Sequence, residues 1–363
     1  MNTALFKVDP ESPDERVLAR AAAILAEGGL VAFPTETVYG LGADATSDRA
    51  VARIFEAKGR PQDNPLIVHV STRDAVPRLA REISPIAESL MDRFWPGPLT
   101  LVVRKSTVVA GRVSPGLDTV GIRMPAHRVA LRLIGLAGVP VAAPSANASG
   151  RPSPTTAAHV MQDLGGRIEA VVDGGPCGVG VESTVLDVTV TPPIILRPGG
   201  VTKEEIEDVL GAVVVDRGGA VDGRPRSPGM KYRHYAPRAR VYVVYSGPQG
   251  DAVTAGMRLS ERAAQFARDG SRVGILASAE TLQSAAGSAG DDEPSGDRVI
   301  WLDAGSESDL PAIAAHLFDN LRRFDDLGVD VILAQAFPET GMGLAIMNRL
   351  LRASGGRVIS DGD

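Results

Sequence analysis

Two short segments carry residues whose types and spacing suit the binding of a phosphorylated ligand. Residues 33–42 read Phe-Pro-Thr-Glu-Thr-Val-Tyr-Gly-Leu-Gly, an apolar strand that runs into a hydroxyl-rich turn closed by glycine. Residues 58–66 read Lys-Gly-Arg-Pro-Gln-Asp-Asn-Pro-Leu and place two cations and an amide after a predicted helix. Hydroxyls and backbone amides orient a ligand, and cations neutralise phosphate. The two segments therefore predict a pocket for a phosphorylated nucleotide beside a small polar substrate.

The second segment also has a purely structural interpretation. Lys58 and Arg60 fit the solvated cations of a helix C-terminus, where the helix dipole favours positive charge. Asn64 favours a ligand site, because a residue before proline is extended and its side chain can project. His69 shares one face of the next predicted strand with Ile67. A strand histidine is either a core residue or a ligand, and the sequence leaves both interpretations open.

Polar residues lie at the ends of several later strands. Residues 141–153 form a strand that ends in small hydroxyl and amide side chains, which let a ligand approach the backbone closely; a plain polar turn is the alternative. Arg123 and Arg197 follow two further apolar runs, at the strand ends where α/β folds bind ligands. Arginine suits bidentate recognition of carboxylate. The sequence contains no Walker A motif, no Gly-x-Gly-x-x-Gly fingerprint and no His/Cys metal cluster.

Composition places the chain among soluble two-domain proteins. It has 363 residues, of which 44% are hydrophobic and 23% charged, and no stretch reaches membrane-spanning length. The one cysteine, Cys177, forms no internal disulfide, so a cytoplasmic protein is expected; the thiol is either a nucleophile or an inert loop residue. The net charge of −6 argues against a whole surface that wraps nucleic acid. Six cations without an acid between residues 223 and 240 predict a local anion contact.

The pattern of elements predicts two α/β domains. Strands are expected at residues 30–33, 66–70, 99–103, 139–142, 170–172, 184–188 and 194–196, and helices at 15–26, 49–57, 85–93, 126–137, 155–164 and 203–210. These alternate without βαβ regularity, so a mixed sheet is expected. A Gly/Pro-rich linker follows at 218–229. A second βα series then predicts a small parallel sheet, with a mobile surface loop at 284–297.

A set of spaced motifs, taken in order, resembles those of the L-threonylcarbamoyladenylate synthases of the two-domain type. The resemblance covers almost the whole chain, and its motifs lie at residues 34–42, 58–66, 144–147, 182–184, 197–199, 227–237 and 343–349. It implies a YrdC-like domain with a twisted mixed sheet over residues 1–215, a linker and active-site lid over 216–239, and a Rossmann-like parallel α/β domain over 240–363.

The resemblance also implies an activity. L-Threonine, bicarbonate and ATP would give threonylcarbamoyl-AMP and pyrophosphate with the help of Mg²⁺. A tRNA threonylcarbamoyl-transferase complex would then pass the group to an adenosine beside the anticodon. The carbamate nucleophile is preformed and anionic, so such a reaction needs positioning and charge neutralisation more than a covalent residue.

Site residues carry over from the same resemblance. The threonine site would comprise Thr37, His69, Arg123, Ala143 and Ser183. The ATP site would comprise Lys58, Arg60, Asn64, Thr119, Ser145, Asn147, Ser153, Arg197 and Tyr235. Catalysis is assigned to Lys58, Arg60, Ser145 and Asn147, and no resident metal site is expected. His234 and Tyr235 would bring the linker over the site as a lid.

Two other classes of function are alternatives to this one. The first is an RNA-binding or ribosome-assembly module, supported by the basic segment 223–240 but opposed by an aromatic content of only 4%. A weak RNA contact remains compatible with the enzyme. The second is a carbamoyl-transfer maturase, which should carry zinc-type cysteine pairs that a single cysteine excludes.

Overall fold

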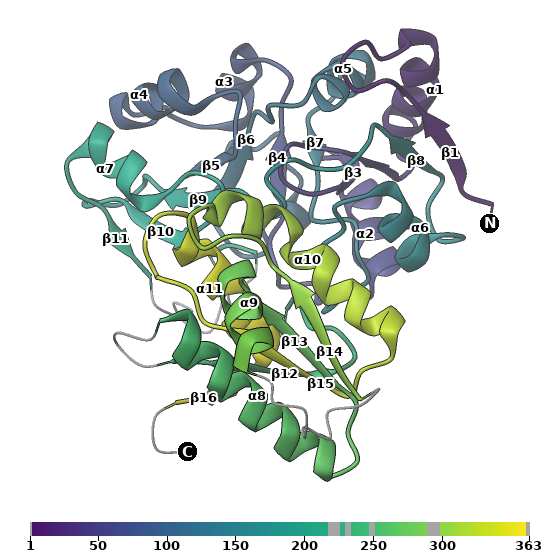
Figure 1. Ribbon diagram of the computed structural model, residues 1–363. Helices are drawn as coiled ribbons and strands as arrows, with labels where there is room; N and C mark the ends of the chain where they lie inside the picture. Colours follow the sequence, from purple (N-terminus) through teal and green to yellow (C-terminus); the bar gives the residue numbers. More distant parts are fainter. Residues whose placement is uncertain (1, 217–225, 229–233, 247–250, 289–297, 361–363) are drawn as a thin grey trace. The chain divides into compact units, whose positions relative to one another are not determined.

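The fold is described from a computed structural model that covers residues 2–216, 226–228, 234–246, 251–288 and 298–360. The chain divides into two compact units (Figure 1). The first contains residues 1–149 and 153–232, and the second contains residues 150–152 and 233–363. The second unit therefore includes three residues, Gly150–Pro152, that interrupt the first unit in the sequence.

The first unit is built on a mixed sheet of eleven strands in the order β1-β8-β2-β3-β7-β4-β6-β5-β9-β10-β11. Its strands are β1 (Ala4–Lys7), β2 (Val31–Phe33), β3 (Gly40–Asp44), β4 (Ile67–His69), β5 (Leu99–Arg104), β6 (Thr119–Arg123), β7 (Val141–Ala142), β8 (Ala170–Asp173), β9 (Thr184–Asp187), β10 (Ile194–Arg197) and β11 (Val214–Val215). Parallel pairs such as β4–β6 alternate with antiparallel pairs such as β5–β6. The expected mixed sheet is confirmed.

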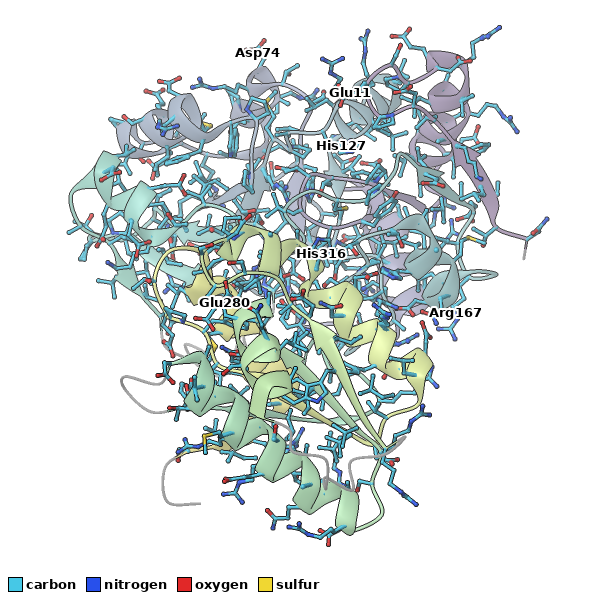
Figure 2. The ribbon with its side chains drawn as sticks, in the orientation of Figure 1. Glu11, Asp74, His127, Arg167, Glu280 and His316 are labelled. Carbon is cyan, nitrogen blue, oxygen red and sulfur yellow. The ribbon has the colours of Figure 1, made fainter. Side chains whose placement is uncertain are left out.

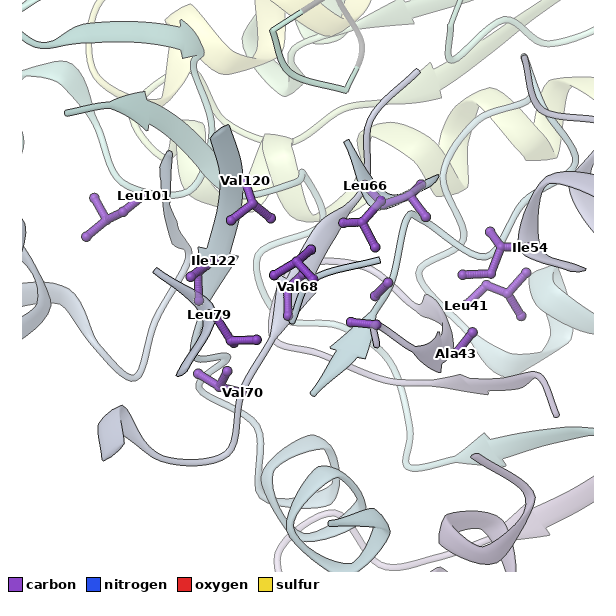
Figure 3. Close-up of a cluster of buried hydrophobic side chains, with 14 of the residues drawn as sticks. Leu41, Ala43, Ile54, Leu66, Val68, Val70, Leu79, Leu101, Val120 and Ile122 are labelled. Carbon is purple, nitrogen blue, oxygen red and sulfur yellow. The ribbon is translucent and has the colours of Figure 1, made fainter. Parts of the chain in front are cut away.

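Helices cover the two faces of this sheet unequally. The helices are α1 (Glu15–Ala26), α2 (Asp48–Lys58), α3 (Val76–Leu79), α4 (Pro85–Phe94), α5 (Arg128–Ala137), α6 (Ala157–Leu164) and α7 (Lys203–Leu210). The larger core forms where α2, α3, α4, α6 and α7 pack on one face, and Figure 3 shows part of it around Val68 and Ile122. A second core forms on the other face, where α1 and α5 cover β1, β8, β2 and β7.

The rest of that second face, over β4, β6, β5 and β9, carries among the described residues a small apolar cluster that includes Ile67, Val102 and Val185. Because side chains alternate along a strand, the residues two positions from these share the same face. They include His69 and Ser183, together with Thr100, Gly121 and Arg123 on the neighbouring strands. The part of the sheet that α1 and α5 leave uncovered thus collects polar and charged side chains.

Strand β3 was not expected, because its two glycines suggested a turn. The structure pairs Gly42 with Val31, and a Cβ on Gly42 would lie 2.8 Å from both the Phe33 ring and the Val141 side chain. Glycine is therefore needed there so that two larger side chains can pack over the strand. The glycine content that argued against a strand in the sequence is thus what allows β3 to be buried.

The second unit has a five-stranded sheet in the order β14-β13-β15-β12-β16, and every pair is parallel, which confirms the expected small parallel sheet. Its strands are β12 (Arg240–Val244), β13 (Val273–Ala277), β14 (Val299–Asp303), β15 (Val331–Gln335) and β16 (Val358–Ile359). Its helices are α8 (Ala252–Arg268), α9 (Ala279–Ser288), α10 (Leu310–Leu327) and α11 (Met342–Ser354). Leu259 of α8 packs on the face of β13 that carries Val273 and Ile275, and Phe324 of α10 packs on Gly274, on the opposite face.

The prediction of a loop at 284–297 is wrong for residues 284–288. Helix α9 continues to Ser288, and residues 289–297 lie outside the described residues. The small side chains from Ser284 onward suggested a loop, but the helix begins earlier, at Ala279. The strong helix formers Glu280, Leu282 and Gln283 of its first turns carry it into the two alanines that follow Ser284. The linker predicted at 218–229 also falls mostly outside the described residues, which include only 226–228 of it.

Candidate active site

Lys58 is buried at the C-terminal end of α2 and contacts the loop that follows β7. Its side chain is 3% exposed, and its Nζ donates hydrogen bonds to the backbone carbonyls of Ser145 and Asn147. The Ser145 hydroxyl donates to the Asn147 Oδ1 at 2.5 Å, and the Ser149 N–H donates to the Lys58 carbonyl at 2.9 Å. The alternative interpretation of Lys58 as a solvated cation at a helix end is therefore wrong, because its ammonium group is buried and bonded to this loop.

Arg60 is also buried, and it orders the entrance to β4. It donates through Nε to the Asn64 carbonyl at 3.3 Å and through Nη2 to the Pro65 carbonyl at 2.9 Å. Asn64 is 1% exposed, and its Oδ1 has no hydrogen-bond partner within the described part of the chain. A buried acceptor of this kind favours a ligand that donates a hydrogen bond.

Arg123, Thr37 and Glu36 form a second buried polar group. Arg123 ends β6, donates to the Thr37 Oγ1 at 2.9 Å and to the Gly97 carbonyl at 3.2 Å, and pairs with the Glu36 carboxylate at 2.6 Å. The Thr35 hydroxyl holds the turn that contains Thr37, because it accepts from the Val38 N–H at 3.2 Å and donates to the Val38 carbonyl at 2.7 Å. The expected carboxylate-binding arginine is therefore pre-positioned by an internal carboxylate.

His69 stands beside Arg123, because the two residues are paired in register between β4 and β6. It is 5% exposed, its ring meets Phe33 edge-on, and its Nδ1 has no hydrogen-bond partner among the described residues. Burial, reinforced by the positive charge of Arg123, lowers the pKa of His69 from 6.5 to about 3. The imidazole is thus neutral near pH 7 and presents an acceptor.

This shift sets a pH dependence of folding stability. The unfolded chain binds a proton at His69 near pH 6.5, whereas the folded chain does so only near pH 3. The free energy of unfolding should therefore fall as the pH drops from 6.5 toward 3, by at most about 1.4 kcal/mol per pH unit from this residue. Chemical denaturation at several pH values should show a shallower fall for His69→Asn than for the wild type.

The matched control for this prediction is His316→Asn, because His316 is exposed on α10 and is labelled in Figure 2. The control should keep the wild-type slope of unfolding free energy against pH. Equal slopes for His69→Asn and the wild type would contradict a neutral, buried His69.

Ser183 and Arg197 meet at the start of β9. Arg197 donates to the Ser183 carbonyl at 2.9 and 3.2 Å and to its Oγ at 3.2 Å, and Ser183 also shares a 2.8 Å hydrogen bond with Thr100. One residue earlier, the Glu182 carboxylate accepts from the Ser153 hydroxyl at 2.5 Å. The residues predicted to bind threonine and those predicted to bind ATP are therefore adjacent at this corner.

Thr119 lies at the other end of β6, opposite Arg104 of β5. It lines a cavity of about 10 Å³ with Ile67, Gly121 and the linker residues Arg226–Pro228, which is room for about one water molecule. Arg226 forms an ion pair with Asp187, whose side chain is 1% exposed. The linker cation that suggested an external anion contact is thus bound by an internal acid.

His234 and Tyr235 belong to the second unit. Tyr235 is 5% exposed, has a φ of 63°, and stacks at 5.2 Å between ring centroids against Phe318 of α10, with the guanidinium of Arg349 over its ring at 5.5 Å. The lid assigned to these two residues stays a prediction. Of the other linker cations, Arg224, Lys231 and Arg233 lie outside the described residues.

Cys177 is buried, and its burial raises the pKa of the thiol well above the usual range. The thiol is therefore protonated at neutral pH, which favours the inert loop residue over the nucleophile. Native protein should not react with an aromatic disulfide reagent at pH 8, whereas urea-unfolded protein should react fully. Cys177→Ala should keep its activity to within about twofold. Rapid labelling of the native protein would contradict this assignment.

The structure brings most of the predicted site residues onto one face and its adjoining loops. One group joins Lys58, Ser145 and Asn147, a second joins Thr37, His69 and Arg123, and a third joins Ser153, Ser183 and Arg197. Ala143 follows β7 and donates through its N–H to the Ile67 carbonyl at 2.9 Å, two residues from His69. Arg60 and Asn64 order the entrance to β4.

Three residues of this site were not predicted from the sequence. They are Glu36, which pairs with Arg123, Glu182, which holds Ser153, and Thr100, which bonds Ser183. The lone hydroxyl in the apolar run of β5 was a signal for Thr100, because a buried hydroxyl needs a partner.

Two features are absent from the described residues. No helix there is both long and apolar enough to cross a bilayer. No group of three or more His, Cys, Asp or Glu side chains in these same ranges could hold a metal ion by itself.

Comparison with known proteins identifies relatives along nearly the whole chain. A family model described as Telomere recombination matches residues 23–199, and one described as Threonylcarbamoyl-AMP synthase, C-terminal domain, matches residues 201–355. The chain is 51% identical to a threonylcarbamoyl-AMP synthase of Pyrococcus abyssi over 96% of this chain and 97% of the relative. It is 49% identical to the corresponding synthase of Bacillus subtilis, over 97% of this chain and 96% of the relative.

A solved structure gives the same result in three dimensions. The structure of P. abyssi Sua5 complexed with L-threonine matches with a TM-score of 0.87 at 48% identity, and the match covers 99% of each chain. Fold and site together define a two-domain α/β enzyme in which a mixed-sheet domain precedes a parallel-sheet domain. The chain belongs to the threonylcarbamoyl-AMP synthase family. The resemblance drawn from the sequence motifs is confirmed.

Proposed function

We propose that this chain makes L-threonylcarbamoyl-AMP from L-threonine, bicarbonate and ATP, with release of pyrophosphate, for the formation of threonylcarbamoyladenosine in tRNA. The observation that carries this proposal is identity of about half of all residues with two threonylcarbamoyl-AMP synthases along nearly the full chain. The buried polar face of the first unit supplies residues of the kind that this reaction needs.

The threonine site is proposed around Arg123. A substrate carboxylate can bind its guanidinium, which Glu36 and Thr37 already orient. His69 offers a neutral acceptor at Nδ1 to the amine or hydroxyl of the substrate. Ser183 and Ala143 complete the proposed set. Threonine is distinguished from serine by one methyl group, which is worth about 1–3 kcal/mol in a fitted pocket.

The proposed reaction has two steps, carbamate formation and adenylation. The threonine nitrogen attacks the carbon of bicarbonate-derived CO₂ and loses a proton to give a carbamate. A carbamate oxygen then attacks the α-phosphorus of ATP, and the bond to the β-phosphate oxygen breaks as pyrophosphate leaves. Lys58, Arg60 and Arg197 are proposed to offset the charge on the phosphates, and Ser145 and Asn147 to position them.

Mg²⁺ is proposed to enter with ATP and not as a resident ion. It binds proteins through one or two carboxylates, with phosphate oxygens and water as the other ligands. Glu182, buried beside Ser153, is a carboxylate of this kind within the proposed ATP group. The ion would supply charge neutralisation on the leaving pyrophosphate.

The remaining assignments are also proposals. Residues 1–215 form the catalytic domain, 216–239 the linker and lid with His234 and Tyr235, and 240–363 the C-terminal domain. The product passes to a tRNA threonylcarbamoyl-transferase complex in the cytoplasm, with at most a weak direct RNA contact. A lid would exclude water from a labile mixed anhydride.

Pyrophosphate release tests the proposal. Purified protein with L-threonine, bicarbonate, Mg²⁺ and ATP should release pyrophosphate, and omission of threonine or of bicarbonate should each abolish the signal. Substitution of serine for threonine should lower kcat/KM by about 10- to 150-fold. Release that is equal with and without threonine would overturn the function.

A further inference from the structure

Helix α10 is buried on two faces, and only one of them packs on its own sheet. The sheet side includes Leu317, Leu321 and Phe324, which are fully buried or nearly so. A second buried row contains Phe318, Arg322 and Asp325, at the spacing of one helix face. Arg322 is 2% exposed and Asp325 is 7% exposed. Buried charges are costly unless other groups pair with them, so this row must have specific partners.

The partners of the charged row include residues from the middle of the chain. Arg322 donates through Nη2 to the carbonyl of Pro152 at 2.5 Å, and Arg151 approaches the Asp325 carboxylate at 3.5 Å. The Asp325 carboxylate also accepts from the Arg238 N–H at 2.7 Å. The Ala236 N–H donates to the Gly150 carbonyl at 2.8 Å. All of these contacts lie within the second unit, which includes Gly150–Pro152.

The same three residues interrupt the loop that carries the proposed ATP ligands. Asn147 lies three residues before Gly150, and Ser153 follows Pro152 directly. On either side the loop is fixed within the first unit, through the Ser149 N–H to the Lys58 carbonyl and through the Ser153 hydroxyl to Glu182. Since one residue spans at most about 3.6 Å, residues 150–152 cannot move far without pulling on Ser153 and, through Ser149, on the segment that carries Asn147.

We propose that Arg322 and Asp325 are positioning residues for ATP binding, which act by holding Gly150–Pro152 and through them Asn147 and Ser153. This rests on the proposed function, since it takes Asn147 and Ser153 as ATP ligands. It gives the C-terminal domain a task in the reaction without any residue of α10 touching substrate. Three of the five proposed threonine ligands, Thr37, His69 and Arg123, lie outside this loop, so threonine binding should depend much less on α10 than ATP binding does.

Kinetics of full-length variants separate positioning from simple stabilisation. Arg322→Met removes the donor to Pro152, and it should raise KM for ATP at least about tenfold, because small misplacements of binding groups are costly. The dissociation constant for threonine, measured by calorimetry, should stay within about twofold of wild type. Arg322→Lys keeps a donor, and its KM for ATP should lie between those of the wild type and Arg322→Met. A role in stability alone would lower the melting temperature and leave KM for ATP unchanged.

The same helix supplies matched controls. Arg323 and Asp326 are exposed neighbours of Arg322 and Asp325, so Arg323→Met and Asp326→Asn should keep wild-type kinetics. If Arg322→Met does not fold, Asp325→Asn keeps the shape and removes the charge, and it should also raise KM for ATP. Equal values of KM for ATP in Arg322→Met or Asp325→Asn and in their controls would overturn the proposal.

Hydrogen exchange gives a readout that does not need the reaction. In Arg322→Met, backbone amides of residues 148–153 should exchange faster than in Arg323→Met, while those of β4 and β6 should not change. Unchanged exchange in the loop would overturn the holding role even if the enzyme is active. Faster loop exchange in a protein that releases no pyrophosphate would instead show that the proposed function has failed and the holding contact has not.

Discussion

Lys58→Met should reduce kcat/KM for ATP by about 10²–10³-fold, the loss that follows removal of one pre-positioned charge-stabilising donor. Two effects combine at this residue. The cation proposed to face the phosphates is lost, and so are the hydrogen bonds that fix the Ser145 and Asn147 carbonyls. Pyrophosphate release at varied ATP concentration measures the change.

The control for Lys58 is Lys203→Met on α7. Lys203 pairs with Glu207 near the surface, where substitutions usually change free energies by less than about 0.5 kcal/mol. This variant should keep kcat/KM within about twofold of wild type. If Lys58→Met had the same kcat/KM for ATP as Lys203→Met, Lys58 would neither neutralise the phosphates nor fix the loop. The melting temperature of each variant shows whether a loss of activity is caused by unfolding.

Gly199→Ala should reduce the free energy of unfolding by about 3 kcal/mol or more. A Cβ at this position would lie 2.2 Å from the Glu182 carbonyl oxygen, 2.4 Å from the Ser183 carbonyl carbon and 2.5 Å from the Thr184 nitrogen. All three are backbone atoms, so no flexible side chain can move aside. The displaced segment carries the Ser183 groups that Arg197 contacts, and activity should fall together with stability. Urea denaturation followed by circular dichroism measures the first effect.

Gly178→Ala provides the comparison, because a Cβ there meets nothing within 4 Å. Its free energy of unfolding should stay within about 0.5 kcal/mol of the wild-type value. If both alanine variants were equally stable, the close approach of strand-end segments around Gly199 would not be as tight as the structure has it.

Elements with strong local signals could be predicted from the sequence. The limits of α1 and α7 were predicted to the residue, and the capping box between Thr202 and Glu205 is present. Strand β3 could not be predicted. Glycine is needed at position 42 because the side chains of Phe33 and Val141 both pack there, and the sequence does not show that these two residues meet. Local propensity carries no information about such packing.

The candidate site shows the same division. Motifs and strand periodicity were enough to place His69, Arg123 and Ser183 at strand ends. The groups that orient them were not visible, because each pairing joins segments far apart in the chain. Asp187 with Arg226 and Glu36 with Arg123 are pairs of this kind. Apolar patterns predict which face of a strand is buried, but they do not predict which acidic side chain pairs with which basic one.

The part of the sheet that α1 and α5 leave uncovered has a thermodynamic consequence. His69 and Arg123 are carried on paired strands of a continuous sheet, and their spacing is set by backbone hydrogen bonds before any ligand arrives. Threonine would then meet a rigid recognition surface, and the entropy of ordering these side chains would already have been lost during folding. Affinity for the amino acid should accordingly owe little to induced fit.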